Sequence, residues 1–403
     1  MNGTLRLQLG NVSPNHDRPT AMPARAASAR DDGDATREGR LVVGGPLFYG
    51  LRAGSNVGGE VYERMLLEQI PAYGIDLVLG LPRDHAIAVP PPGWRVDVLR
   101  HGRDLHWTWA PLVYLPYVRR LLLECDVDVL RGHSVRYTGP SLLLGRATVR
   151  SDVPVVLHHH HFYPRWARLE AAIARRADGV ITVSEHSRGQ LIAAGLSPDR
   201  VHVVLEGVAR PPATAGWPEA WPTEGLRLLH LGRLETRKRS WIAVDALASL
   251  RRTGVSASLV VAGDGPLRQD LARRSSELGI RDHVRFVGRV AEVGKWRLYD
   301  SADVLLFTST LEGFGLVAAE AQSRGVPVVA SAGTATAEAL DPDRSGFLAA
   351  PHGDAFAWRI AELADASLRE TMSAHARQFA LRFDWNAAAA GVAAAYRAIV
   401  SRR

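Results

Sequence analysis

The chain has 403 residues, enough for two domains that each bury a core of their own. Its only cysteine, Cys125, excludes a disulfide framework and is typical of a reducing compartment, so we expect a cytoplasmic protein. The net charge of +7 comes from dispersed arginines and not from a basic stripe, which excludes a typical nucleic-acid binder. No apolar run approaches about 18 residues and no hydrophobic segment opens the chain, so we expect neither a membrane span nor a signal peptide.

The N-terminal residues show no pattern of secondary structure, and the first predicted elements follow them. Residues 1–39 are rich in Arg, Asp, Ala, Pro and Ser without periodicity, and we interpret them as a disordered tail. Residues 41–45 then read as a buried strand, and a glycine-rich stretch that includes Gly58 and Gly59 opens a helix. The backbone N–H groups of such a loop can approach phosphates closely.

An aromatic stretch at residues 105–117 allows two interpretations. Its mixture of Trp, Tyr and Arg is typical of segments that lie on a membrane surface. Alternatively, it is a helix packed beside an acceptor pocket, with Trp107 and Trp109 in the pocket wall. We favour the helix, because the polar and apolar faces are not cleanly segregated.

Two further predicted strands, residues 128–133 and 154–157, end at histidines. The first ends at His133, and the second is followed by four histidines, residues 158–161. Side chains on a strand alternate between its faces, so at most two of the four converge, and zinc needs more ligands.

Two Asp-x-Asp pairs also suggest a metal. They are Asp126 with Asp128, and Asp341 with Asp343. The first pair precedes a strand and the second lies in a turn, so neither falls at the carboxyl end of a strand. We therefore expect no metal site.

A proline-rich stretch from residue 209 separates two halves of the pattern, and a basic loop opens the second half. This loop follows a predicted strand and contains Gly232, Arg233 and Lys238. Arginine as a fork and lysine as a point charge could together hold a diphosphate. Of the 49 basic residues only Lys238 and Lys295 are lysines, which suggests a specific need for an ammonium group at residue 238, although the alternative is a solvated loop. The sequence indicates no role for Lys295.

The next two predicted strands also run into glycines. Residues 259–262 lead to Gly263, and residues 284–287 lead to Gly288, Arg289 and Val290. A glycine after a strand is common in turns, so neither glycine alone indicates a binding site.

The most informative stretch is Glu312 to Glu320, in which two carboxylates stand eight positions apart. A buried strand at residues 302–307 precedes it, and a helix predicted over residues 316–323 begins inside it. The intervening turn and helix start consist of Gly313, Phe314, Gly315 and Leu316. In parallel α/β units ligands bind beyond the carboxyl ends of the strands, and a helix N-terminus attracts diphosphate.

Together these segments resemble family 4 glycosyltransferases, which are retaining enzymes of the GT-B fold. The resemblance covers about residues 41–400 and implies an α/β architecture, with two Rossmann-like, doubly wound domains that face a deep interdomain cleft. It implies an acceptor domain at residues 40–208, a linker at 209–226 and a nucleotide-sugar domain at 227–383. The helix at 384–403 would cross back to the first domain.

The resemblance also implies roles for the residues named above. Glu312 would hold the transferred sugar, Glu320 the ribose, and Arg233 with Lys238 the diphosphate. His160 would contact the donor sugar and His133 the acceptor. The remaining donor-binding positions would be Gly58, Gly59, Gly232, Gly263, Gly288, Arg289, Val290, Gly313, Phe314, Gly315 and Leu316.

Three positions depart from the family's pattern. Thr308 stands where proline is common, and Glu206 replaces an asparagine. Thr334 replaces a glycine, and its side chain leaves less room for the donor sugar to approach the backbone. The following Glu338 is present.

We therefore predict a metal-independent, retaining hexosyltransferase that takes a UDP- or GDP-linked sugar to a small hydrophilic acceptor, without nucleic acid and without favoured membrane contact. The alternatives are a lipid acceptor at a membrane surface and an inactive sugar-nucleotide-binding protein. Oligomeric state and pathway are not predicted.

Overall fold

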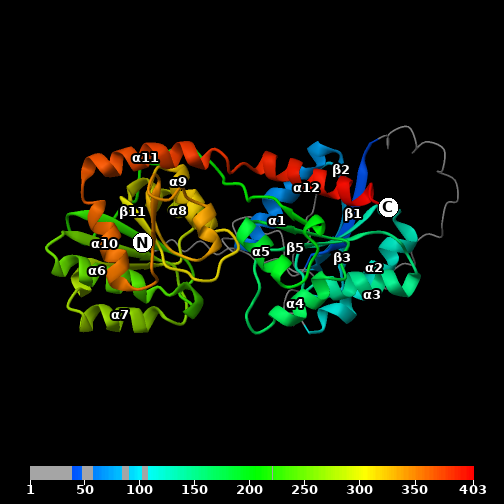
Figure 1. The fold of residues 1–403 in the computed structure, drawn as a ribbon, viewed down its shortest axis with the longest axis horizontal. Helices are drawn as coiled ribbons and strands as arrows, with labels where there is room; N and C mark the ends of the chain where they lie inside the picture. The colour runs from blue at the N-terminus through cyan, green and yellow to red at the C-terminus, as the bar shows by residue number, and fades with distance from the viewer. Residues whose placement is uncertain (1–38, 48–57, 84–89, 102–107, 220) are drawn as a thin grey trace, which may run out of the picture. The chain divides into compact units, whose positions relative to one another are not determined.

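A computed structural model describes residues 39–47, 58–83, 90–101, 108–219 and 221–403, and the statements below concern these ranges. Residues 1–38 of the predicted tail, most of the glycine-rich loop and Trp107 lie outside them. Residues 40–403 form one contact unit, which contains two parallel sheets (Figure 1).

The first sheet has seven parallel strands in the order β3-β2-β1-β4-β5-β6-β7. The chain builds outward from β1 in one direction and then from β4 in the other, so the switch point lies between β1 and β4. The strands are β1 (Leu41–Pro46), β2 (Ile75–Pro82), β3 (Trp94–Leu99), β4 (Val129–Gly132), β5 (Val155–His159), β6 (Gly179–Thr182) and β7 (Val201–Val203).

The second sheet repeats this topology with six parallel strands in the order β10-β9-β8-β11-β12-β13. Its switch point lies between β8 and β11, which pair in register through Val304 with Leu228. The strands are β8 (Leu226–Leu231), β9 (Ala257–Ala262), β10 (Val284–Gly288), β11 (Val304–Phe307), β12 (Val328–Ser331) and β13 (Gly346–Ala349).

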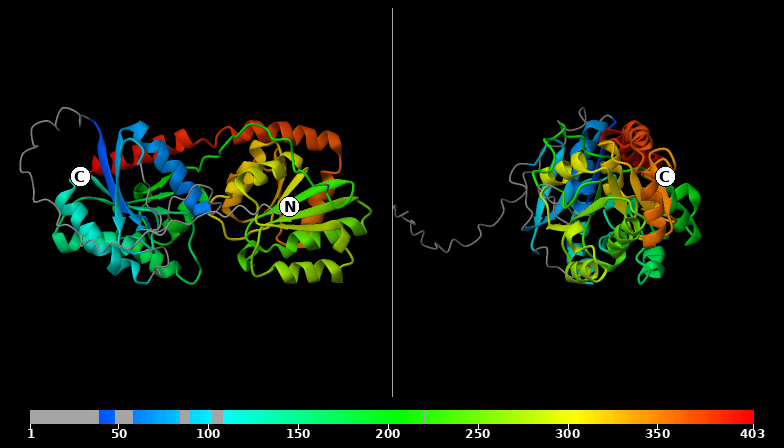
Figure 2. Two further views of the ribbon diagram at one scale, coloured as in Figure 1. Left: turned by 180° about the vertical axis from the view of Figure 1, so that it is seen from behind. Right: turned by 90° about the vertical axis from the view of Figure 1, so that its left-hand side faces the viewer.

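Helices cover both faces of the second sheet, which explains why its strands are nearly continuous apolar runs. Helices α6, α7 and α10 cover one face, and α8 and α9 cover the other (Figures 1 and 2). Leu228 packs into the core of the first face, and its neighbour Leu229 packs into the core of the second. The helices are α6 (Trp241–Arg252), α7 (Arg268–Glu277), α8 (Glu292–Ser301), α9 (Leu316–Ser323), α10 (Gly353–Glu362) and α11 (Ala366–Ala380).

The first sheet is covered in the same way, with α1 and α12 on one face and α2 to α5 on the other. The last helix reaches β5, because Tyr396 lies 2.9 Å by its hydroxyl from Nε2 of His158. The helices are α1 (Gly58–Gln69), α2 (Ala110–Glu124), α3 (Gly139–Val149), α4 (Ala167–Ala174), α5 (Glu185–Ala193) and α12 (Trp385–Val400). Short 3₁₀ helices are η1 (Ile70–Tyr73), η3 (Pro198–Arg200), η4 (Thr236–Lys238), η5 (Arg281–His283) and η6 (Ala335–Glu338).

These sheets confirm the predicted pair of doubly wound α/β layers. The helix predicted over residues 316–323 is α9, with the same bounds. The strand predicted from residue 302 begins later, at Val304, and the carboxylate of the preceding Asp303 accepts hydrogen bonds from the backbone and side chain of Arg227. The predicted domain boundaries at residues 208 and 227 stay predictions.

Candidate functional site

The switch point of the second sheet brings together two charged residues that the sequence singled out. Lys238 follows β8 in η4, and Glu312 follows β11. Since β8 and β11 are parallel neighbours, both loops leave the sheet at the same edge. The Lys238 Nζ lies 2.6 Å from Oε1 of Glu312, and each side chain is only 14% exposed.

Neighbouring cations keep Glu312 ionised. Burial alone would raise the pKa of this carboxyl, but the charges of Lys238 and Arg237 outweigh it and lower the pKa below its ordinary value. Arg237 Nη1 lies 3.3 Å from Oε1 of Glu312. The site therefore presents a carboxylate that accepts hydrogen bonds.

Arg237 was missed by the sequence analysis, and Arg233 reaches the site only through intermediates. Arg233 is 56% exposed and pairs with Glu235 at 2.9 Å. Glu235 in turn contacts Arg237 at 3.4 Å. The basic loop is thus a chain of alternating charges that ends at Glu312.

Two hydroxyl groups fix the backbone of the basic loop. Thr308 Oγ1 donates to the Lys238 carbonyl at 2.7 Å, and Ser309 Oγ donates to the Arg237 carbonyl at 3.3 Å. A proline at residue 308 has no such donor. The departure from the family's pattern at Thr308 therefore has a structural purpose, because it locks the β11 exit to the loop that carries Lys238.

The glycine turn before α9 allows a close approach of the backbone. A Cβ on Gly313 would lie 2.4 Å from the His160 carbonyl oxygen, so a larger residue does not fit there. Phe314 between the glycines is buried and packs edge-on against Phe383, with ring centres 5.1 Å apart. Gly315 has φ of 108° and caps α9 without a side chain, which leaves the first N–H groups of this helix available to an anion.

The start of α5 contacts the glycine turn and η6. Ser184, which caps α5, bonds to the turn, and Glu338 of η6 bonds to the first residues of α5. Ser184 Oγ donates to the Gly313 carbonyl at 2.6 Å. The Glu338 carboxylate accepts from the N–H groups of Glu185 and His186, at 2.8 and 2.7 Å, at the start of α5. These partners are 129 to 153 residues apart, and the sequence analysis did not find them.

Two of the four consecutive histidines lie in the core. His158 lies between the hydroxyls of Tyr62 and Tyr396, at 3.2 and 2.9 Å, and is 1% exposed. Burial lowers the pKa of His159 to about 3, so it is neutral. Both side chains are buried, His158 at 1% and His159 at 3% exposure.

His160 and His161 are partly exposed after the end of β5. His160 Nδ1 lies 3.3 Å from Oε1 of Glu206, and its ring is 27% exposed. Burial lowers the pKa of His161 to about 4, against the opposing charge of Glu312. Glu206, which replaces the family's asparagine, therefore pairs with the histidine that the sequence analysis selected.

Glu320 lies apart from the contact of Lys238 with Glu312. It is 4% exposed on α9, where Lys295 and Tyr299 of α8 bind its carboxylate. The remaining predicted donor positions line the strand ends. Gly232 donates to the Ala262 carbonyl at 3.0 Å, and Gly263 donates to the Gly288 carbonyl at 2.7 Å. Arg289 and Val290 follow at the exit of β10, with Arg289 exposed.

On the acceptor side, His133 follows β4 at the switch point of the first sheet. It is 3% exposed, and burial lowers its pKa to about 4. Gly58 and Gly59 begin α1, and Trp109 immediately precedes α2 with 61% of its surface exposed. In the described ranges no group of three or more His, Cys, Asp or Glu residues could hold a metal ion. No helix there is long and apolar enough to cross a bilayer.

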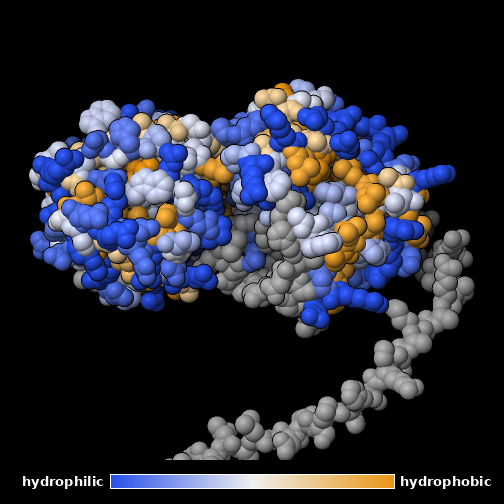
Figure 3. Space-filling view, turned by 90° about the horizontal axis from the view of Figure 1, so that it is seen from below, coloured by the Kyte–Doolittle hydropathy of each residue, from blue (hydrophilic) through white to orange (hydrophobic). Residues whose placement is uncertain are grey.

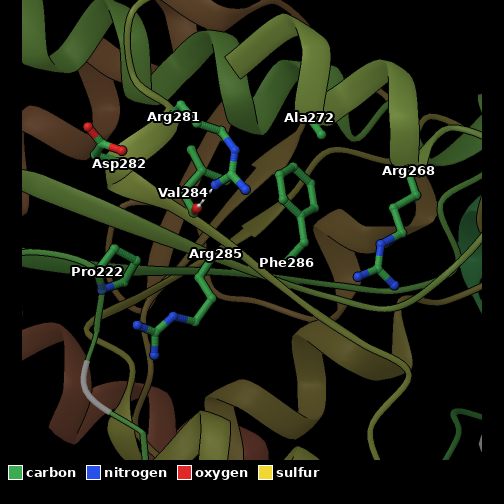
Figure 4. Close-up of a pocket in the computed structure, with 8 residues that line it drawn as sticks. All are labelled: Pro222, Arg268, Ala272, Arg281, Asp282, Val284, Arg285 and Phe286. Carbon is green, nitrogen blue, oxygen red and sulfur yellow. Dashed lines mark hydrogen bonds between the residues drawn. The ribbon is translucent and has the colours of Figure 1, made fainter. Parts of the chain in front are cut away.

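A pocket of about 500 Å³ lies beside β10, outside these positions. Figure 4 shows Arg281 and Arg268 on either side of Phe286 and Arg285 pointing away from it, with Arg281 donating to the Val284 carbonyl at 3.3 Å. Arg285 also pairs with Glu219 at 3.2 Å, and Arg268 with Asp264 at 3.8 Å. Each arginine therefore already has a partner in the chain.

Comparison with known proteins identifies the family. The model for "Glycosyltransferase Family 4" matches residues 57–210, and that for "Glycosyl transferases group 1" matches residues 215–379. Glycogen synthase of Mycobacterium tuberculosis is 33% identical over 292 residues, which cover 67% of this chain and 69% of the relative. The chain belongs to glycosyltransferase family 4. Phosphatidyl-myo-inositol mannosyltransferase of Mycobacterium leprae is 28% identical over 363 residues, which cover 85% of this family 4 chain and 94% of the relative.

Solved structures agree with the fold of this family 4 protein. Sucrose-phosphate synthase from Thermosynechococcus elongatus superposes with a TM-score of 0.73 at 21% identity, over 90% of this chain and 100% of the other. HepE of Anabaena, in complex with UDP and glucose, gives a TM-score of 0.67 at 20% identity, over 88% and 99%. The GT-B architecture expected from the sequence is therefore confirmed.

Proposed function

We propose that this glycosyltransferase moves a hexose from a UDP- or GDP-linked sugar to an acceptor hydroxyl, with retention of configuration and without a metal. One observation carries the proposal: the Lys238–Glu312 contact stands at a topological switch point, beside the start of α9 that no side chain caps. A cation, an ionised carboxylate and a helix N-terminus are what a sugar diphosphate needs.

Each group has a distinct role in the proposal. Lys238, with Arg233 from the exposed end of the charge chain, holds the diphosphate against the N–H groups of α9. Glu312 accepts hydrogen bonds from hydroxyls of the transferred sugar. His160, whose Nδ1 faces Glu206, directs its Nε2 to the same sugar.

The proposed reaction is a displacement on one face of the sugar. The bond from the anomeric carbon to the diphosphate oxygen breaks, and the bond to the acceptor oxygen forms on the same side. The acceptor proton passes to the departing phosphate, and Lys238 with the dipole of α9 stabilises the charge on the leaving group. These groups supply the positive charge that a metal ion would otherwise bring.

A thermal-shift screen with UDP, GDP and ADP, and then with their sugars, tests this proposal. We expect one nucleoside diphosphate to raise the melting temperature, and its sugar form to be consumed when acceptors are added. Stabilisation without turnover across an acceptor panel would favour the inactive binding protein. No stabilisation by any nucleotide would refute the proposed donor.

A second candidate concerns the acceptor, for which the sequence favours a small hydrophilic molecule. The outward face of α2 is apolar: Leu112 and Leu123 are 59% and 67% exposed, next to Trp109. Leu144 of the neighbouring α3 is 44% exposed, and hydrophobic residues gather on the surface that Figure 3 shows. Exposed apolar residues interspersed with Arg119 fit an anionic lipid surface, and a mannosyltransferase named for phosphatidyl-myo-inositol is among the relatives.

Sedimentation with anionic liposomes at physiological salt distinguishes the two acceptors. For a lipid acceptor, the protein pellets with the liposomes, and the double substitution Leu112→Ser and Leu123→Ser releases it. The matched control is Val293→Ser, which removes an equally exposed apolar residue from α8. Absence of binding by the wild-type protein would support the small hydrophilic acceptor.

A further inference from the structure

The only two lysines of the chain pair with the two glutamates that the sequence singled out. Lys238 Nζ lies 2.6 Å from Glu312, and Lys295 Nζ lies 2.7 Å from Oε1 of Glu320. The other 47 basic residues are arginines, so an ammonium group at both places is a marked exception. The geometry gives Lys295 a role that its sequence context does not suggest.

Two residues of helix α8, Lys295 and Tyr299, bind the Glu320 carboxylate. Lys295 lies in its first turn, and Tyr299, one turn further along, donates its hydroxyl to Oε2 of Glu320 at 2.9 Å. Lys295 also contacts Glu292 at 3.0 Å, and its Nζ lies 5.0 Å from the ring centre of Trp296. Both carboxylate oxygens of Glu320 are thus held, each by a different donor.

This arrangement is too buried to be an ordinary surface ion pair. Lys295 is 7% exposed, Glu320 is 4% exposed and Tyr299 is fully buried. Burial raises the pKa of Glu320, and Lys295 and Tyr299 act against this effect. Without these two donors the carboxyl would be protonated more easily and free to change rotamer.

Glu320 still has capacity for a ligand. An ionised carboxylate has about four acceptor positions, and Lys295 and Tyr299 occupy two of them. Glu320 lies five residues beyond Gly315 on the helix whose start would hold the diphosphate. At about 1.5 Å per residue, the Cα of Glu320 is roughly 7 to 8 Å along the helix axis from Gly315, a distance that a ribose can span.

We propose that Lys295 and Tyr299 are positioning residues that hold the Glu320 carboxyl group in one orientation, so that it accepts hydrogen bonds from the ribose hydroxyls of the donor. The inference rests on the proposed function, since it requires a ribonucleotide at this edge of the sheet. It assigns Lys295 to nucleotide recognition and not to the transfer step. Loss of Lys295 therefore weakens donor binding and leaves kcat nearly unchanged.

The test compares ribonucleotides with their 2′-deoxy forms by calorimetric titration. UDP and dUDP, and GDP and dGDP, are titrated into the wild-type protein and into Lys295→Met, Tyr299→Phe and Glu320→Gln. We expect the wild-type protein to prefer the ribo form about tenfold or more, which corresponds to one hydrogen bond to a charged group. Lys295→Met and Glu320→Gln each remove most of this preference, and the double variant that combines these two substitutions shows no further loss.

Two variants separate positioning from a purely structural ion pair. Lys295→Arg keeps the charge and is expected to retain part of the ribo preference, and Tyr299→Phe removes a single hydroxyl and lowers the preference by a smaller factor. If Lys295→Met melts at a lower temperature but keeps the full ribo preference, the pair is only structural and the inference is wrong. If Lys295→Met does not fold, an unchanged ribo preference in Tyr299→Phe and Lys295→Arg overturns it instead.

The outcomes also distinguish this inference from the proposed function. Failure of the wild-type protein to bind UDP or GDP would refute the proposed donor. Binding of UDP or GDP with equal affinity for its deoxy form would leave the donor in place and refute the role of Glu320 and Lys295.

Discussion

The ammonium group of Lys238 is the most sensitive point of the proposed site. Lys238→Met keeps the length of the side chain and removes its charge, and with it the 2.6 Å contact to Glu312. Arg237, at 3.3 Å, is then the nearest cation to Glu312. Loss of one electrostatic donor at a developing anion costs about 2 to 4 kcal/mol of transition-state stabilisation, so kcat/KM should fall about 30- to 1,000-fold.

The assay measures steady-state release of nucleoside diphosphate, with circular dichroism to verify the fold. The matched control is Arg252→Ala, which removes a cation that is 76% exposed at the end of α6 and pairs with an equally exposed Asp354 at 3.5 Å. The control should keep its kcat/KM within about twofold, as expected for an isolated surface pair. A folded Lys238→Met enzyme with near-normal turnover would refute the reasoning and restore the view that residues 237–239 are a solvated loop.

Three further predictions follow from the same geometry. EDTA should leave transfer unchanged, and activity abolished by EDTA and restored by Mg²⁺ or Mn²⁺ would contradict the metal-free proposal. Gly313→Ala should lower kcat/KM or the melting temperature, because its Cβ would lie 2.4 Å from the His160 carbonyl oxygen. Steady-state kinetics and thermal unfolding measure the two quantities, and no change in either would show that the turn can move to accommodate the methyl group. The Lys238–Glu312 pair lowers the pKa of Glu312, so its contribution to stability is present above the ordinary value of 4.5 and is lost as pH falls through the lowered value. Urea unfolding between pH 6 and 3 should therefore show a smaller loss of stability in Glu312→Gln than in the wild-type protein, and equal losses would contradict the assignment.

The sequence predicted the parts of the site that lie next to strand ends. Lys238 and Glu312 follow predicted strands, and neighbouring parallel strands bring such loops to one edge. The helix at residues 316–323 was also readable, because glycines mark both of its ends.

The partners contributed by other elements could not be read from the sequence. The pairing of Lys295 with Glu320 depends on how α8 rotates against α9, and the pairing of Glu206 with His160 joins residues from different strand ends. Helical or strand periodicity predicts the faces of a single element and does not predict either of these contacts between elements. The sequence showed Lys295 as one of only two lysines, but nothing in it indicated where the side chain of Lys295 points.

The sequence also did not show which side chains of the aromatic segment face the core. In and beside α2, Tyr114 and Tyr117 are buried, whereas Trp109 and Leu112 are exposed. Polar and apolar residues are not cleanly segregated along this segment, so its helical period did not mark one buried face.

Hydrogen exchange in the presence of saturating UDP, and separately of GDP, tests the central claim most directly. The account predicts that one of them slows amide exchange in peptides covering residues 228–240 and 308–323, which carry Lys238, Glu312 and the start of α9. Protection absent from both peptides, or confined to residues 268–286 around the β10 pocket, would contradict the placement of the donor at the switch point.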